Sequence, residues 1–263
     1  MDARIRPRDP VAREALGRYL ATRGAARIAA VLLEEARMFG GDPARIAAQL
    51  APLYESLGDW RALLSLPGAP LTVAERKRAA WLTEHPPTVR ADLTSVVLTG
   101  TVRGDTLGRI TIRIAGRPVL AIIVARDVGV IVGARAVGTA SIRFSGDSRT
   151  IVIDSIRIGA ARLAMVPATL DTASGVAIIG IGALSPMNVA FDYERKRVLF
   201  NQPRGAGKTH TVPLFREHGE LRIAETTPLR WLSLASFIAR AYSGPGARPV
   251  TIDLKAGEIR IAD

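Results

Sequence analysis

The chain has 263 residues, of which 48% are apolar and 23% charged, so it is long enough for one large or two ordinary folded domains and is not disordered. It contains no cysteine, which excludes disulfides, thiolate metal centres and cysteine nucleophiles. The net charge is +12, but the basic residues are spread along the whole chain and aromatic residues make up only 5%. This composition argues against specific nucleic-acid binding. The positive charge is interpreted either as a general attraction of acidic partners or as a contribution to solubility.

Residues 1–88 are predicted to form an all-α module. Apolar residues recur at helical spacing in 15–20, 28–38 and 46–57, and each segment is followed by glycine. Asp42 before Pro43 predicts a helix N-cap, and Thr72 with Glu75 three residues later predicts a capping box. The pattern indicates antiparallel helix pairs, interpreted as a packing or docking module without chemistry of its own.

After residue 88 the apolar period changes from helical to alternating. Short alternating segments lie at 96–98, 110–114, 140–144 and 151–153, separated by glycine or aspartate turns. They predict a barrel or sandwich of antiparallel type over 89–201. The remaining residues, 202–263, form a C-terminal extension in which 229–242 has helical spacing and 250–261 forms a hairpin.

No apolar stretch approaches the roughly 20 residues needed to cross a bilayer, so we expect no membrane span. The first ten residues carry charges and two prolines and are not followed by the apolar core of a signal peptide. The sequence is compatible with a cytoplasmic location. It is equally compatible with a periplasmic or exported one, if a signal is absent from this chain.

The most informative segment of the chain is 178–200. It reads Ile-Ile-Gly-Ile-Gly-Ala-Leu-Ser-Pro over 178–186, then Val-Ala-Phe-Asp-Tyr from Val189 and Arg-Val-Leu-Phe from Arg197. Upstream, residues 108–124 contain an alternating strand, Ala-Gly-Arg-Pro-Val and an apolar strand, and Ile-Gly and Met-Val-Pro follow at 158–159 and 165–167. In order and spacing these motifs resemble the retropepsin-like family of bacterial aspartyl-protease-like proteins over about 93–201.

The resemblance implies a fold and a local geometry. It implies an α+β multidomain chain, with the helical module followed by an all-β acid-protease barrel lobe and a strand–helix–hairpin extension. It also implies that Ile178, Ile179 and Gly180 pass close to the catalytic loop, where a side chain at the glycine would not fit. No cofactor is implied, and no metal site, because the three histidines lack ligand spacing.

The catalytic motif is where this sequence departs from the family. The family's Asp-Thr-Gly falls, without gaps, on 124–126, so Val124 occupies the place of the aspartate. The chemistry needs two adjacent carboxylates that share a proton, and valine supplies none. Asp127, followed by Val128 and Gly129, would be a displaced variant of the motif if three residues were inserted.

Two other segments look like functional motifs. Asp171-Thr-Ala-Ser resembles the protease signature but lies seven residues before Ile178, where the family has a surface loop. Residues 205–209 (Gly-Ala-Gly-Lys-Thr) lack the leading glycine of a phosphate-binding loop. We interpret both as structural.

A single lobe supplies only one aspartate, so catalysis would require a second lobe or a homodimer. The segments 250–254 and 258–261 echo 189–193 and 197–200, and a helical segment precedes each hairpin. Residues 202–263 are therefore candidates for a remnant second lobe. No catalytic-loop signature accompanies them.

The leading hypothesis is an aspartic-protease-like pseudoenzyme whose former cleft binds a peptide or small apolar ligand, or has been repurposed for other chemistry. The expected cleft residues are Val124, Arg126, Gly129, Ile131, Ile179, Gly180 and Leu184. One alternative is an active aspartic endopeptidase that works as a homodimer through Asp127. Another is a structural interaction protein that acts through the helical module.

Overall fold

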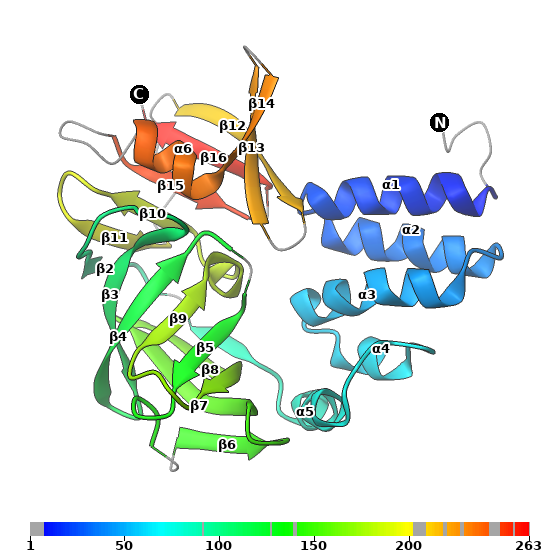
Figure 1. Cartoon of the computed structure of the whole chain (residues 1–263), viewed down its shortest axis with the longest axis horizontal. Coiled ribbons are helices and arrows are strands. Elements are labelled where there is room, and N and C mark those ends of the chain that lie inside the picture. Colours follow the sequence, from blue (N-terminus) through cyan, green and yellow to red (C-terminus); the bar gives the residue numbers. More distant parts are fainter. Residues whose placement is uncertain are drawn as a thin grey trace. The chain divides into compact units, whose positions relative to one another are not determined.

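The computed structural model describes residues 8–90, 92–126, 128–138, 141–201, 209–217, 220–226, 229–241, 248–254 and 256–262. The chain divides into two compact units, Met1–Pro86 and Pro87–Asp263. Helices make up the first unit and strands dominate the second (Figure 1). The predicted fold class, a helical module followed by a β-barrel lobe and an extension, is confirmed.

The first unit contains five described helices: α1 (Pro10–Thr22), α2 (Ala26–Met38), α3 (Pro43–Leu57), α4 (Trp60–Ser65) and α5 (Val73–Glu84). Consecutive helices pack side by side (Figure 1). Their starts follow the sequence signals, because Asp42 accepts hydrogen bonds from the amides of Ala44 and Arg45 and the Thr72–Glu75 capping box is complete. Leu33, Ile46, Leu50 and Leu82 are fully buried between the helices.

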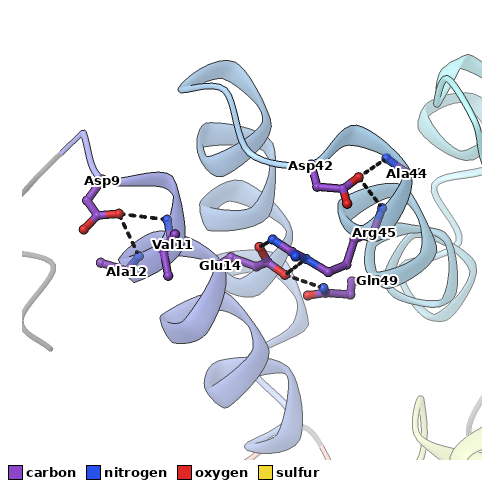
Figure 2. Close-up of polar contacts among 8 residues, drawn as sticks. All are labelled: Asp9, Val11, Ala12, Glu14, Asp42, Ala44, Arg45 and Gln49. Atoms are coloured by element: carbon purple, nitrogen blue, oxygen red, sulfur yellow. Dashed lines mark hydrogen bonds and ion pairs between the residues drawn. The ribbon is translucent and has the colours of Figure 1, made fainter.

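A buried carboxylate joins two of these helices. Glu14 on α1 accepts two hydrogen bonds of 2.8 Å from the guanidinium of Arg45 on α3, and a third of 2.8 Å from Gln49 (Figure 2). The hydrogen bonds from Arg45 lower the pKa of Glu14, although its burial acts in the opposite direction. The network fixes the position of α1 against α3 because a buried carboxylate without its partner would be costly.

The second unit begins with a six-stranded barrel. Its strands are β3 (Thr106–Ile114), β4 (Arg117–Val124), β5 (Val130–Gly133), β7 (Thr150–Ile158), β8 (Ala161–Asp171) and β9 (Ala177–Gly180). They follow the order β8-β5-β9-β4-β3-β7, and pairing of β7 with β8 closes the barrel. Two short strands are added at the edges of this sheet: β1 (Thr88–Arg90) pairs with β8, and β6 (Ile142–Ser145) pairs with β7.

The turn spacing predicts a purely antiparallel barrel, but the barrel contains both parallel and antiparallel strand pairs. β9 pairs parallel with β4 and β5 pairs parallel with β8. The reason is a long-range insertion: β9 enters between β4 and β5, which are neighbours in sequence and would otherwise form a hairpin. Local turn signals report only connections between consecutive strands, so they cannot reveal such an insertion.

A second sheet contains strands from both ends of the unit. It has the order β14-β13-β12-β16-β15-β10-β11-β2. Its members are β2 (Thr94–Val97), β10 (Val189–Asp192), β11 (Arg197–Phe200), β12 (Thr209–Glu217), β13 (Glu220–Thr226), β14 (Leu229–Ser233), β15 (Val250–Asp253) and β16 (Glu258–Ala262). The short helix η2 (Ile181–Leu184) precedes β10, and α6 (Leu234–Ala241) follows β14. The predicted helical segment 229–242 is thus wrong in its first five residues, which pair with β13 as a strand.

Candidate functional site

The candidate site is the loop between β4 and β5, residues 125–129. The strand β9 lies between these two strands, parallel to β4 and antiparallel to β5. The loop therefore has to cross the end of β9 to connect its two neighbours. Gly180, the last residue of β9, is the residue over which it crosses.

The crossing is close enough to exclude a side chain at Gly180. Its amide donates a 2.7 Å hydrogen bond to the carbonyl of Gly129. A Cβ atom added to Gly180 would lie 2.7 Å from both the carbonyl oxygen of Arg126 and the amide nitrogen of Val128. The expected close passage of the Ile-Ile-Gly segment and this loop is confirmed.

The position expected to carry the first catalytic carboxylate is occupied by a half-buried valine. Val124 is the last residue of β4 and pairs directly with Gly180, in a ladder that runs without a bulge from Ala121. Asp127, the other candidate, lies outside the described residues. The gap-free alignment of the motif on Val124 and the displaced alignment on Asp127 therefore both stay predictions from the sequence.

The loop is held on two sides by its own chain. Ala125 donates a backbone hydrogen bond of 2.8 Å to Asp105, and the guanidinium of Arg126 lies 2.6 Å from the Asp105 carboxylate. On the other side, Arg126 forms an antiparallel backbone bridge with Glu220, the first residue of β13. Sequence analysis missed Asp105 and Glu220, because nothing in a linear pattern pairs residues from three distant segments.

The seven expected cleft residues divide into two groups. Ile179, Gly180 and Leu184 are buried, and both large side chains belong to the hydrophobic core. Val124 and Ile131 are half-buried, and Arg126 and Gly129 are exposed. Only this second group is accessible to a ligand. The buried residues Ile179, Gly180 and Leu184 would act only indirectly, by supporting the conformation of the loop.

The Asp-Tyr pair at the end of β10 has a structural role. The buried Asp192 accepts hydrogen bonds from the amide of Arg195 and from the guanidinium of Arg197 on β11. The hydroxyl of Tyr193 donates to the carbonyl of Leu107, at the start of the barrel, and burial raises the pKa of this phenol. These bonds close the β10–β11 hairpin and tie it to β3.

The C-terminal hairpin repeats this arrangement. Asp253, also buried, accepts from the amide of Ala256 three residues later and from the guanidinium of Arg260 on β16. In each hairpin a buried aspartate therefore caps the turn and pairs with an arginine on the next strand. The echo seen in the sequence corresponds to the same local structure.

The two hairpins are also neighbours in the second sheet, and the six strands around them have a symmetric arrangement. β10 pairs antiparallel with β15, and Val189 stands opposite Ile252 as Val250 stands opposite Phe191. On the outer side of each hairpin lies one further antiparallel strand, β2 against β11 and β12 against β16. In the strand order β2-β11-β10-β15-β16-β12, β10 thus corresponds to β15, β11 to β16 and β2 to β12. This correspondence is what a local two-fold axis between β10 and β15 requires.

The other sequence motifs do not form sites in the described residues. The Asp171 side chain accepts from the amide of Ala173 and shapes the turn after β8. Of the segment 205–209, all but the last residue lies outside the described residues. Among the described residues no group of three or more metal-binding side chains occurs, and no described helix is long and apolar enough to cross a membrane.

The helical module carries an open groove of about 550 Å³. Residues lining it include Arg27, Val31, Glu34, Glu35, Met38, Tyr54 and Asp59. Its carboxylates already have partners: Glu34 accepts from the Tyr54 hydroxyl and pairs with Arg37, and Glu35 pairs with Arg13. The groove offers apolar contact surface but no unpaired charge from these glutamates.

Comparison with known proteins gave matches among solved structures alone. No model of a known protein family matches the chain, and no curated protein matches it in sequence. Among solved structures, it is similar to a retropepsin-like aspartic protease from Rickettsia conorii, with 7% sequence identity and a TM-score of 0.31. The match covers 43% of this chain and 93% of that protein.

Proposed function

We propose that this chain is an aspartic-protease-like protein without proteolytic activity, whose β unit binds a peptide or small apolar ligand beside the loop 125–129. The observation that carries the proposal is Val124, which pairs with Gly180 where the resemblance to the retropepsin-like family places the first catalytic aspartate. Hydrolysis by this class requires two carboxylates that share one proton, one to activate water and one to polarise the carbonyl. A valine can do neither.

The C-terminal extension supports the same conclusion. We interpret residues 202–263 as a reduced second lobe. The two-fold arrangement of the six strands, and the similar hairpins that contain Asp192 and Asp253, relate it to the first lobe. Its sequence contains no Asp-Thr-Gly or Asp-Ser-Gly. On this interpretation the chain supplies both halves of its site and carries the motif in neither.

The accessible residues around the loop define what could bind. Val124 and Ile131 offer an apolar surface, and Arg126 adds a cation that stays exposed in its 2.6 Å contact with Asp105. An apolar peptide side chain, or a small apolar molecule with an acidic group, matches this combination.

A cleavage assay tests the loss of activity. The purified protein and its Asp127→Ala variant are incubated with a mixed peptide library between about pH 3 and pH 8, which spans the titration of paired carboxylates. Mass spectrometry should detect no cleavage by either protein. Cleavage by the parent that is lost in Asp127→Ala would overturn the proposal and establish the alternative, an active endopeptidase through Asp127.

A binding assay tests the ligand site. The same library is equilibrated with the protein, and retained peptides are identified and titrated by calorimetry. Ile131→Asp should abolish retention, whereas Leu120→Asp, at an exposed position on β4, should not. Retention that both variants preserve would place the binding surface elsewhere, and the groove of the helical module would then be tested first.

A further inference from the structure

Four arginines from four adjacent strands stand in one line across the outside of the barrel. Arg90 on β1 is the direct partner of Arg162 on β8, Arg162 of Arg157 on β7, and Arg157 of Arg113 on β3. Directly opposed residues of antiparallel strands point to the same face. All four are exposed, so the guanidinium groups form a row on the surface (the arginine row).

The arginine row is only partly neutralised. Asp92 lies 3.4 Å from Arg90, where both side chains are largely exposed, and Asp154 lies 4.0 Å from Arg162. Asp154 has a closer partner in Arg143, at 2.8 Å, whose hydrogen bond lowers the pKa of this carboxyl. The guanidinium of Arg113 donates a 2.8 Å hydrogen bond to the carbonyl of Gly116, which carries no negative charge.

Such a row lowers the stability of the sheet. Like charges directly opposite each other on neighbouring strands repel, and here three successive pairs do so. An anion that lies along the row would relieve this repulsion. Guanidinium groups are suited to phosphate in particular, because their planar N–H groups match two phosphate oxygens at once.

The surroundings of the row distinguish among anionic partners. Two positions from the arginines along the four strands, the residues are small: Thr88, Thr111, Ser155 and Ala164. On the adjoining strand β4, the exposed Leu120 stands opposite Thr111. These neighbours provide one large apolar side chain, which is too little surface to anchor the protein in a membrane, and no aromatic ring on which a base could stack. A partner that is recognised only through its phosphates fits this surface.

The length of the row is comparable with a short stretch of duplex nucleic acid. Neighbouring strands lie about 4.8 Å apart, so four strands place the arginines along roughly 14 Å. One strand of a duplex carries a phosphate about every 3.4 Å of helix axis, which gives about four phosphates over the same length. Four arginines can neutralise at most four phosphates, which sets the upper limit of the expected salt dependence.

We propose that the arginine row is a docking surface for the phosphate backbone of double-stranded nucleic acid, bound without reading the base sequence. It is separate from the loop 125–129 and does not depend on the function proposed for that loop. The composition argues against base-specific recognition, and the row requires none.

Salt dependence of duplex DNA binding tests the row. Four phosphate contacts predict a slope of log affinity against log salt of about −3.6, and hence an affinity about 150-fold weaker at 200 mM than at 50 mM salt. The double variant Arg113→Gln/Arg157→Gln keeps two contacts. Its slope should fall to about −1.8, with a loss of about 12-fold over the same salt range.

The matched control is Arg103→Gln/Arg149→Gln, which removes two exposed arginines of the same unit outside the row. It should keep the parent slope, and thermal melting should show that both double variants are folded. Equal slopes for the two double variants would show that DNA binding depends only on the net charge of the protein, and would overturn the proposal. So would unequal affinity for unrelated duplexes of one length, or binding to phosphatidylserine vesicles but not to DNA.

Discussion

The amide of Gly180 donates a 2.7 Å hydrogen bond to the carbonyl of Gly129, which holds the loop after β4 against the end of β9. This contact joins two segments about fifty residues apart and leaves no room for a side chain between them. The contact therefore fixes the loop directly beside Val124, the last residue of β4.

We predict that Gly180→Ala destabilises the β unit by about 1–3 kcal/mol, the usual range for an overpacked interior. The added methyl group would lie 2.7 Å from backbone atoms of Arg126 and Val128, which cannot rotate away as a side chain could. Urea unfolding measures the change. Gly175→Ala is the control, because a Cβ there meets nothing within 4 Å; an equal loss in both variants would show that the close crossing is not the cause.

The Glu14–Arg45 pair should make the helical module sensitive to acid. The pKa of Glu14 in the folded protein is lowered, chiefly by the hydrogen bonds from Arg45, below its ordinary value of 4.5. The stabilisation is therefore fully present above pH 4.5 and is lost as the pH falls through the lower, folded value. Hydrogen-exchange protection of the α1 amides should decrease over that interval.

Glu14→Gln should remove this part of the pH dependence and cost about 1–3 kcal/mol at neutral pH, because charge-assisted hydrogen bonds to a buried carboxylate are lost. Glu84→Gln, at the exposed end of α5, serves as the matched control. An acid response of α1 that Glu14→Gln leaves unchanged would contradict the assignment.

The two hairpin aspartates should behave alike. Asp192→Ala and Asp253→Ala each remove a buried acceptor from a turn amide and an arginine, and each should cost about 1–3 kcal/mol in urea unfolding. The corresponding Asn variants should lose less, since the amide oxygen still accepts from the turn. Asp147→Ala removes a similar turn cap at an exposed site and should have the smallest effect. A large difference between Asp192→Ala and Asp253→Ala would contradict the proposed equivalence.

The chain is expected to be monomeric. Both edges of β10 are already paired, one with β11 and the other with β15, so a second copy cannot add to the sheet at the two-fold axis. Sedimentation velocity at several protein concentrations should give a single species of 28.1 kDa. A concentration-dependent dimer would revive the homodimeric alternative and direct attention to the outer strands β2 and β14.

Elements that depend on local signals were predicted well from the sequence. The caps at Asp42 and Thr72 and the terminal hairpin are where their residues indicate, since each requires only neighbours within a few positions. The strand at Leu229–Ser233 was missed because its apolar residues also satisfy a helical period, and pairing with β13 decides between the two.

The candidate site shows the same division. Val124, Gly129 and Gly180 could be identified from motif order alone, and the steric requirement at Gly180 followed from the resemblance. The contacts of Arg126 with Asp105 and Glu220, and the burial of Ile179 and Leu184, could not. They depend on which strands become neighbours, and a one-dimensional pattern does not encode that.

By itself, the sequence determined the helical module, the β unit and the repeated hairpin, and it predicted the close approach of Gly180 to the loop after Val124. Short-range periodicity, caps and turns are sufficient for these features because their interactions span few residues. Only the tertiary structure decided that β9 enters between β4 and β5, that the two hairpins meet across a two-fold axis, and that four separate arginines stand in one row. Each of these depends on the register between distant strands, which is selected by packing of the whole core.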